Sequence, residues 1–355
     1  QIARLPLNDD EPVSTRTVIG PGAREPLIIE APVIISHMSF GALSKEAKLA
    51  LARGSAAVKT AMSSGEGGIL PESMETAYRY IFEYVPNRYS VSEEYLSRVD
   101  AVEIKLGQSA KPGMGGHLPG SKVTEEIAKI RGFAPGQDII SPAHHDDIRT
   151  PHELAEKVAW LRDVTGGRPI GVKLAAGNLD ADLDAVMLSR PDFITIDGRA
   201  GATGAAPKFI KRSASMPTVF ALDKARTILD CHGNDVSLIV TGGLRVSSDF
   251  AKALALGADA IAIGTTALMA IGCRQYRICH TGRCPMGIAT QDPELRKNLI
   301  VDHAARRLEN FLRVTLNELS AFARLTGHDD LHALSVNDLC TVSSEISNHT
   351  RIAHV

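Results

Sequence analysis

The sequence of 355 residues has little tryptophan and cysteine: it contains one tryptophan, five cysteines and only 5% aromatic residues. Charge of one sign is not in excess, since 39 Lys and Arg residues stand against 41 Asp and Glu residues. A chain without a polycationic face is not expected to bind nucleic acid or an anionic membrane surface. No apolar run approaches membrane-spanning length, and the first residues lack a secretory apolar segment, so we expect a cytoplasmic protein.

What the sequence does contain is a repeated alternation of strand and helix patterns. With 44% hydrophobic residues, the chain can bury one large core or two modest ones. Short branched apolar runs predict eight strands, at 33–35, 58–62, 101–105, 138–141, 170–174, 193–197, 238–241 and 260–263. Apolar residues at three- and four-residue steps predict helices over 45–57, 124–130, 151–163, 183–188, 221–229, 248–256 and 302–324. Strands and helices in this order predict an α/β fold, the (β/α)8 or TIM barrel.

Four regions are expected along the chain. Residues 1–30 contain four prolines among polar residues, which favours an extended N-terminal arm lying over the body. The barrel is predicted to cover 31–272, with an aromatic-rich insert over 70–100, after its second strand, that we interpret as a lid or interface excursion. A cysteine-containing loop is expected over 273–292, and a C-terminal helical extension over 293–355.

Three of the five cysteines lie within twelve residues, in the pattern C-x5-C-x4-C-P: Cys273, Cys279 and Cys284. Three thiolates on one short loop suit a metal or an iron-sulfur cluster better than a disulfide framework. Three ligands match a three-iron cluster with an empty corner. A zinc ion with His280 as the fourth ligand and a loop of unliganded thiols are the alternatives. The isolated Cys231 and Cys340 are expected to fill space in the core or near the surface.

Glycine-rich turns follow several predicted strands, and the chemistry of a barrel of this kind lies at those strand ends. Gly242 and Gly243 follow the seventh strand, and Gly264 and Thr265 follow the eighth. Glycine lets the backbone approach a ligand closely, with peptide N–H groups free to bind anionic oxygens. Two such turns in successive units predict a phosphate site. Because no P-loop or dinucleotide fingerprint follows a strand, a mononucleotide such as FMN is the better assignment.

Charged residues are predicted at the same barrel mouth. Lys173 ends the fifth strand, where a cation can stabilise a reduced flavin ring; an ordinary ion pair with Asp197 or Glu103 is the alternative. A dicarboxylate substrate is indicated by three further cations and one acid: Lys105, Lys111, Arg131 and Glu66. Arg131 would grip one carboxylate with two hydrogen bonds and Lys111 would pair with the other. Taken singly, each would be a solvated surface charge.

Longer motifs make the chain resemble a known family over residues 36–299, about three quarters of its length. The motifs are M-S-F-G-A-L-S from Met38, S-G-E-G-G from Ser64, G-Q-S-A-K-P-G-M-G-G-H-L-P-G from Gly107, I-S-P-A-H-H-D-D-I from Ile140, D-G-R-A-G-A-T-G-A from Asp197, T-G-G-L-R from Thr241, and the cysteine motif from Cys273 to Asp292. In these motifs the chain resembles the central FMN-binding and iron-sulfur domain of glutamate synthase, in its archaeal-type, stand-alone form.

The resemblance implies two cofactors. FMN would lie across the barrel mouth and contact Met38, Ser39, Ser64, Gln108 and Lys173. Its phosphate would be held near Gly201, Gly242, Gly243, Gly264 and Thr265. A 3Fe-4S cluster that feeds the flavin would be held by Cys273, Cys279 and Cys284.

The resemblance also implies a reaction, reductive amination. The substrate 2-oxoglutarate would be surrounded by Glu66, Lys111 and Arg131, and His117 stands where family members usually carry glutamine, an exchange that keeps a hydrogen-bond donor. Ammonia would condense with the ketone to give 2-iminoglutarate, and reduced FMN would deliver a hydride to the imine carbon, producing L-glutamate. Electrons would arrive singly through the cluster.

Partner functions are expected outside this sequence. The glutaminase of the family uses a cysteine at its first residue, whereas Gln1 is first here and no cysteine precedes Cys231. A four-cysteine cubane run and an NAD(P)H fingerprint are also missing. We therefore expect ammonia to be free or supplied by a glutaminase partner, and electrons to come from a partner subunit or a ferredoxin. The alternatives are a related FMN barrel acting on another amine, as in N-methylglutamate synthase, and a non-catalytic electron-transfer subunit.

Overall fold

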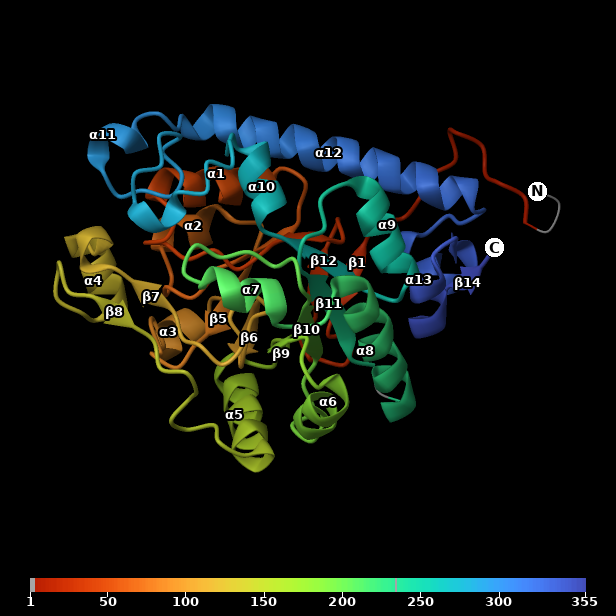
Figure 1. Ribbon diagram of the computed structural model, residues 1–355, viewed down its shortest axis with the longest axis horizontal. Helices are drawn as coiled ribbons and strands as arrows, with labels where there is room; N and C mark the ends of the chain where they lie inside the picture. The colour runs from red at the N-terminus through yellow and green to blue at the C-terminus, as the bar shows by residue number, and fades with distance from the viewer. Residues whose placement is uncertain (1–3, 234) are drawn as a thin grey trace.

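Eight parallel strands close into a barrel in the computed structural model, which describes residues 4–233 and 235–355 (Figure 1). In ring order the strands are β3 (Val33–Ile35), β4 (Ala61–Ser63), β5 (Arg79–Tyr84), β6 (Ala101–Lys105), β9 (Ile170–Ala175), β10 (Phe193–Asp197), β11 (Ser237–Thr241) and β12 (Ala260–Ile263). β12 pairs with β3, so the ring has no free edge. The predicted TIM barrel is confirmed.

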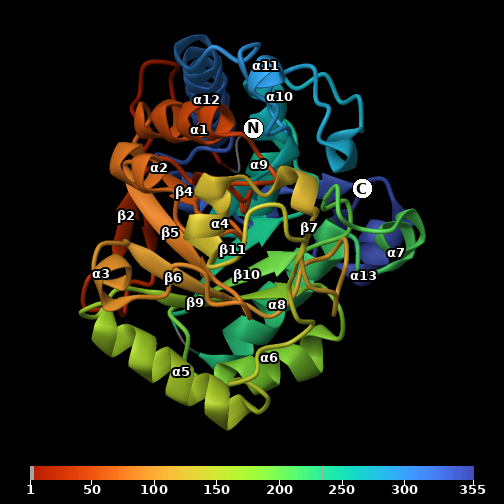
Figure 2. The same cartoon turned by 90° about the vertical axis from the view of Figure 1, so that its left-hand side faces the viewer.

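The helices cover the outside of this barrel. Figure 2 shows α1 and α12 on one side of the strands and α5 and α6 on the opposite side. The helices are α1 (Lys45–Ala56), α2 (Pro71–Thr76), α3 (Glu93–Leu96), α4 (Glu125–Arg131), α5 (Pro151–Val164), α6 (Leu179–Met187), α7 (Lys208–Ser213), α8 (Thr218–His232), α9 (Ser247–Ala255), α10 (Thr265–Ala270), α11 (Pro293–Arg296), α12 (Val301–Leu325) and α13 (Ser344–His349). Every predicted helix corresponds to one of these, although α6 and α8 begin three or four residues earlier than predicted.

The strand prediction was wrong in one place. The barrel strand between β4 and β6 is β5, inside the segment that we predicted to be an insert, whereas residues 138–141 contribute only β8 (Ile139–Ile140), outside the barrel. The side chains of β5 point alternately to the two faces of the sheet. Ile81 belongs to the apolar cluster inside the barrel, whereas Tyr80, Phe82 and Tyr84 pack against the outer core. Because these aromatic side chains line one face of a strand, they are core residues and not the surface of a lid.

The segment that does leave the barrel lies between β6 and β9, and we call it the excursion. It contains β7 (His117–Leu118), which pairs antiparallel with β8, and it also contains α4. Figure 1 shows these elements together at one end of the molecule. A separate small core holds the excursion against the barrel, with Tyr89, Leu118 and Ile127 among its buried residues. The predicted insert therefore exists, but it lies after the fourth barrel strand and not after the second.

The N-terminal arm does more than lie over the body. It contains no helix between residues 4 and 30, as predicted, but it forms a hairpin of β1 (Thr17–Ile19) and β2 (Leu27–Ile29). The hairpin side chains Ile19, Leu27 and Ile29 pack with Ile34 and Phe193 from the barrel interior. Since Phe193 is the first residue of β10, the hairpin closes the barrel at the amino ends of its strands.

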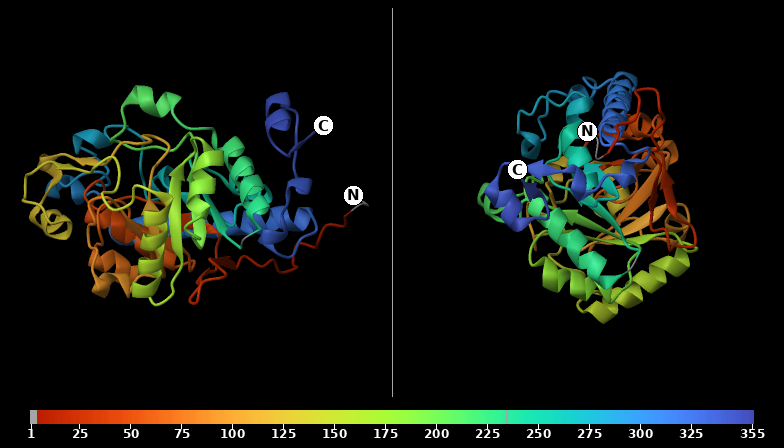
Figure 3. Two further views of the ribbon diagram at one scale, coloured as in Figure 1. Left: turned by 90° about the horizontal axis from the view of Figure 1, so that it is seen from below. Right: turned by 90° about the vertical axis from the view of Figure 1, so that its right-hand side faces the viewer.

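The C-terminal region packs on the outside. α12 runs along α1 and is buried through Leu308, Leu312 and Leu319. Beyond it, β13 (Cys340–Thr341) pairs with β14 (Ala353–His354) next to α13. Figure 3 shows this C-terminal segment and the N-terminal arm at the same end of the molecule. Within the described ranges, no helix is both long and apolar enough to cross a membrane.

The closed end of the barrel leads to a stability prediction. A Cβ atom at Gly171 on β9 would lie 2.2 Å from Cε2 of Phe193, whose side chain is fully buried. We expect Gly171→Ala to lower the free energy of unfolding by about 1 to 3 kcal/mol, because Phe193 has no space to move into. Urea denaturation measures this change. Gly22→Ala is the control, since a Cβ there meets nothing within 4 Å; equal stabilities for the two variants would contradict this packing.

Candidate active site

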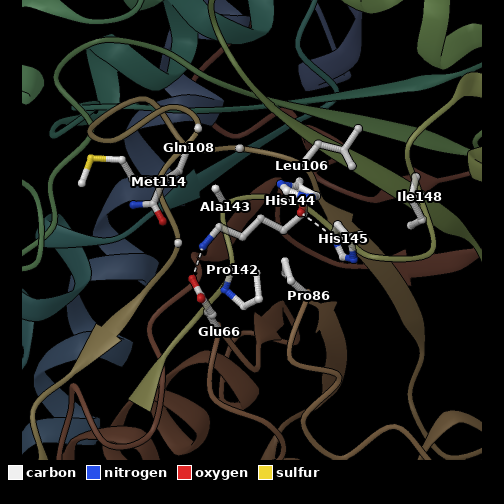
Figure 4. Close-up of a pocket in the computed structure, with 14 residues that line it drawn as sticks. Glu66, Pro86, Leu106, Gln108, Met114, Pro142, Ala143, His144, His145 and Ile148 are labelled. Atoms are coloured by element: carbon white, nitrogen blue, oxygen red, sulfur yellow. Dashed lines mark hydrogen bonds and ion pairs between the residues drawn. The ribbon is translucent and has the colours of Figure 1, made fainter. Parts of the chain in front are cut away.

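Side chains from the carboxyl ends of several strands meet at one cavity of about 90 Å³, whose lining is part polar and part apolar. Glu66 follows β4 and Gln108 follows β6, while His144 and His145 belong to the excursion. Figure 4 shows these four residues around the cavity, together with Met114. The cavity lies at the carboxyl ends of the strands, which is the end of the barrel where this fold places its chemistry. We call this end of the barrel the mouth, and it is the candidate active site.

Glu66 is the centre of the charged groups in this mouth. Its Oε2 lies 2.5 Å from the ammonium of Lys105, and its Oε1 accepts a hydrogen bond of 3.2 Å from the N–H of Gly116. Lys111, which is 3% exposed, donates to the carbonyl of Gly115 at 2.5 Å. Burial alone would raise the pKa of Glu66, but Lys105 and Lys111 outweigh it and hold the pKa at about 2. The carboxylate is therefore ionised at neutral pH.

This lowered pKa makes stability depend on pH. A carboxylate with a pKa of about 2 when folded and 4.5 when unfolded stabilises the protein above pH 4.5, and that stabilisation is lost as pH falls towards 2. The shift corresponds to about 3 kcal/mol at most. We therefore expect Glu66→Gln to be less stable than wild type at pH 6 and the difference to shrink between pH 4.5 and 3. Urea denaturation at these pH values tests this. Glu94→Gln, an exposed carboxylate on α3, should show no such convergence; a Glu66→Gln difference that is constant with pH would contradict the assignment.

Below the mouth, the barrel interior contains a layer of buried charges. Glu83 on β5 lies 3.8 Å from the ammonium of Lys105 and 3.7 Å from that of Lys173. Glu103 on β6 pairs with the imidazole of His37 and accepts a hydrogen bond from the hydroxyl of Thr195. Lys173 therefore forms an ion pair with Glu83, and not with Asp197 or Glu103, which were the alternative to a flavin contact. Within residues 4–233 and 235–355, both carboxylate oxygens of Glu83 lack a hydrogen-bond partner.

Arg131 and His117 were both predicted to face a substrate, and the structure separates them. Arg131, the last residue of α4, is buried; its Nη2 donates to the carbonyl of Phe40 at 2.7 Å, and its guanidinium lies over the ring of Tyr89. A Cβ at Gly67 would lie 2.8 Å from this Nη2, next to the Glu66 loop. His117, in contrast, is 51% exposed and pairs with Asp138 at 3.2 Å. Arg131 is therefore buried beside the Glu66 loop, but it lines a second pocket next to Tyr89 and not the cavity that Glu66 lines, while His117 lies at the surface.

The residues predicted to contact a flavin lie on two touching loops. Met38 and Ser39 follow β3, and Ser64 follows β4. A Cβ at Gly65, whose φ is +72°, would lie 2.5 Å from both the carbonyl carbon of Met38 and the nitrogen of Ser39. Glycine is therefore required for this approach. The hydroxyl oxygen of Ser64 accepts from the N–H of Glu83 at 2.9 Å, so the buried charge layer is attached directly to these loops.

The residues predicted to bind a phosphate follow three neighbouring strands, β10, β11 and β12. They are Gly201, Gly242, Gly243, Gly264 and Thr265. The turns after β11 and β12 are linked, because the hydroxyl of Thr266 donates to the carbonyl of Leu244 at 2.8 Å. A Cβ at Gly264 would meet only Ser36, at 3.9 Å, so the space beside this turn is open.

The three clustered cysteines lie on the loop between α10 and α11, and none forms a disulfide. Cys284 is buried, Cys273 is half-buried and Cys279 is exposed. Burial raises the pKa of the Cys279 thiol, and Cys273 and Cys284 raise it further. The ammonium of Lys122 donates to the carbonyl of Cys279 at 2.7 Å, which ties this loop to the excursion.

Several residues of the site were missed by the sequence analysis. Lys48 and Gln291 are buried and bind backbone carbonyls of the loop after β3. A signal existed for Lys48, because it lies between Ser44 and Leu51 on the buried stripe of α1. Glu83 also had a signal, since it alternates with aromatic residues in β5. For Gln291 no local pattern distinguishes it from an exposed polar residue.

Comparison with known proteins gives a consistent family assignment. The model of the family described as a conserved region in glutamate synthase matches residues 1–329. The chain is 41% identical over 326 residues to an archaeal glutamate synthase (NADPH) of Methanocaldococcus jannaschii, covering 91% of this chain and 63% of that protein. An archaeal-type glutamate synthase (NADPH) of Thermotoga neapolitana is 40% identical, with 94% and 66% covered. The chain thus spans just under two thirds of the length of these two relatives.

A further relative is matched over more of its own length. A glutamate synthase large subunit-like protein of Rhizobium meliloti is 38% identical over 365 residues, covering 97% of this chain and 83% of that protein. Among solved structures, a mandelate oxidase variant with a monooxide FMN adduct aligns with a TM-score of 0.57 and 15% identity, covering 93% of this chain and 85% of that one. At this identity the likeness concerns the barrel fold alone. Taken with the family model and the relatives, the motifs at the strand ends establish that the chain belongs to the glutamate synthase family.

Proposed function

We propose that the chain is the synthase core of a glutamate synthase, an FMN-dependent oxidoreductase that makes L-glutamate from 2-oxoglutarate and ammonia. The observation that carries this proposal is the mouth, where Lys105 and Lys111 act on one ionised acid, Glu66, and Arg131 is buried beside the same loop. Cations from a strand end, a loop and a helix end suit a substrate with two carboxylates. The names of the relatives support the same reaction.

FMN fits the residues present at the rim of the barrel. The N–H groups of Gly243 and Gly264 have no acceptor in the parts of the chain that the structure describes, so they are available to phosphate oxygens. Lys173 is 3% exposed, and its ion pair with Glu83 is long, at 3.7 Å, which leaves an ammonium available to a flavin edge. Met38, Ser39, Ser64 and Gln108 would hold the ring. When bound, FMN would supply the hydride that reduces the imine.

The residues of this chain would hold the substrate in position and neutralise the charges of its carboxylates. Arg131 and Lys111 would each bind one carboxylate of 2-oxoglutarate, which fixes the orientation of the ketone carbon. Glu66, ionised at neutral pH, can accept hydrogen bonds but cannot donate them, so it would orient ammonia or the protonated imine of 2-iminoglutarate. His117 has no role in this proposal, because it lies outside the mouth.

We propose that a 3Fe-4S cluster is bound by Cys273, Cys279 and Cys284. The cluster would pass electrons to the flavin one at a time. Three thiols without a fourth cysteine on the same loop match the ligand count of a three-iron cluster, whereas a zinc ion would need His280 as its fourth ligand.

The remaining functions would come from partners. The reaction needs a source of ammonia and a source of electrons, so we propose a glutaminase subunit or domain for the first and an electron-donor subunit or ferredoxin for the second, in the cytoplasm.

One experiment tests the proposed reaction. Protein reconstituted with FMN is reduced with dithionite under anaerobic conditions and mixed with 2-oxoglutarate and ammonium, while flavin absorbance and glutamate are followed. We expect reoxidation only with both substrates, and one glutamate for each flavin reoxidised. Reoxidation with methylamine in place of ammonium, or none with either amine, would contradict the proposal.

A further inference from the structure

A buried lysine outside the mouth contacts both loops that are proposed to hold the flavin. Lys48 lies on α1 and is only 1% exposed. Its ammonium donates three hydrogen bonds: 2.9 Å to the carbonyl of Met38, 3.2 Å to that of Ser63 and 2.9 Å to that of Ser64. The first carbonyl belongs to the loop after β3, and the other two belong to the end of β4 and its loop. One side chain therefore joins two barrel units at the level of the mouth.

The chemistry of the ammonium matches this environment. It has three N–H donors, and three carbonyl oxygens use all of them, whereas a neutral amine has only two. Burial lowers the pKa of Lys48 to about 7, with the charge of Glu83 acting in the opposite direction, so burying this cation is costly. The three carbonyls and the nearby carboxylate of Glu83 offset that cost. Such a group is not needed for packing alone, because an apolar side chain of similar length would fill the same space.

α1 itself is firmly anchored, so that Lys48 acts from a fixed position. The hydroxyl of Ser44 accepts from the N–H of Ala47 and donates to the carbonyl of Gly287 at 2.6 Å. The side-chain amide of Gln291 donates to the carbonyls of Gly41 and Leu43 at 3.0 and 2.9 Å. The start of α1 is therefore held by the part of the cysteine loop that follows its last cysteine, Cys284.

We propose that Lys48 is a positioning residue that holds the loop containing Met38 and Ser39 against the loop containing Ser64 and Gly65, in the arrangement that receives the flavin ring. The inference rests on the proposed function, because it requires FMN at this place. Lys48 does not touch the ring or the substrate in this proposal; it acts through the two loops.

The test compares Lys48→Met with Lys45→Met. Lys45 lies one turn earlier on α1 and pairs with Glu72 and Glu126 at the surface, so it is a matched control. FMN affinity is measured for each apoprotein by quenching of flavin fluorescence, and stability by urea denaturation. We expect Lys48→Met to bind FMN at least tenfold more weakly, even though its loss of stability is no larger than that of Gly171→Ala, and Lys45→Met to bind as wild type does. Lys48→Arg, which keeps the charge, should recover part of the affinity.

Two further variants distinguish the positioning of the loops from a general loss of stability. Gly171→Ala destabilises the opposite end of the barrel, so it should keep its FMN affinity; a loss there equal to that of Lys48→Met would mean that lowered stability alone weakens binding. If Lys48→Met does not fold, Gly65→Ala, which pushes the same two loops apart, should weaken FMN binding in its place. Wild-type affinity in whichever of these two variants folds would overturn the inference. Failure of wild-type protein to bind FMN would instead overturn the proposed function.

Discussion

Replacing Cys279 with serine is expected to abolish assembly of the iron-sulfur cluster. A 3Fe-4S cluster needs all three cysteines, and the loop offers no fourth thiol to substitute, since Cys231 and Cys340 lie in other elements. Iron content and visible absorbance of anaerobically reconstituted protein measure the effect. We expect iron to fall from about three per chain to near zero, while FMN remains bound, because the flavin loops do not include this cysteine.

The controls for this experiment are Cys231→Ser and Cys340→Ser. Both cysteines are exposed and isolated, so both variants should keep iron at the wild-type level. A second readout separates electron entry from the amination itself: dithionite-reduced Cys279→Ser should still make glutamate, whereas transfer from a protein electron donor should stop. Iron retained in Cys279→Ser, or one zinc per chain in wild type, would contradict the cluster assignment.

Replacing Arg131 with alanine is expected to weaken binding of 2-oxoglutarate by about 2 kcal/mol or more, which is about thirtyfold in Kd. Without the guanidinium, one carboxylate of the substrate would lose two hydrogen bonds and stay unpaired in a mostly buried mouth. Flavin absorbance changes on titration with 2-oxoglutarate measure the affinity. Arg131→Lys keeps the charge but not the planar pair of donors, so its affinity should be intermediate.

The contacts of Arg131 within the protein require further measurements on the Arg131→Ala variant. Part of this guanidinium already binds the carbonyl of Phe40 and lies over Tyr89, so truncation also removes internal contacts. FMN affinity and stability must therefore be measured on the same variant. Lys129→Ala, an exposed cation on the same helix, is the control and should bind 2-oxoglutarate normally. Unchanged affinity in a folded, flavin-loaded Arg131→Ala would remove this residue from the substrate site.

Much of the site was accessible from sequence because it depends on local chemistry. The glycine turns after β11 and β12 and the spacing of the cysteines are properties of short segments, and each implies its chemistry without knowledge of distant residues. The motif from Ser64 to Gly68 places Glu66 in the same way. Residues whose surroundings come from far along the chain were less predictable: His117 was assigned to the substrate, but its short hairpin turns it towards Asp138 at the surface.

The error in the barrel strands has a similar cause. The residues of β5 and those of β8 both form short apolar patterns, and period-two alternation alone does not say which one joins the ring. The decision depends on neighbours: Arg79–Tyr84 pairs with β4 and β6, and its aromatic face is covered by the outer core. Among the strands of the described residues, β8 pairs with β7 alone, beside a small separate core.

The sequence by itself determined the barrel class, the clustered thiols and the glycine turns, because periodicity, spacing and backbone freedom are local physical properties. Only the tertiary structure decided which lysines meet which carboxylates. Lys173 could face any acid on a neighbouring strand, and closure of the ring brings it to Glu83. Lys48 looks like one more charged residue on a helix until packing of α1 directs its ammonium into three carbonyls. Burial and long-range proximity, which no short segment encodes, select these partners.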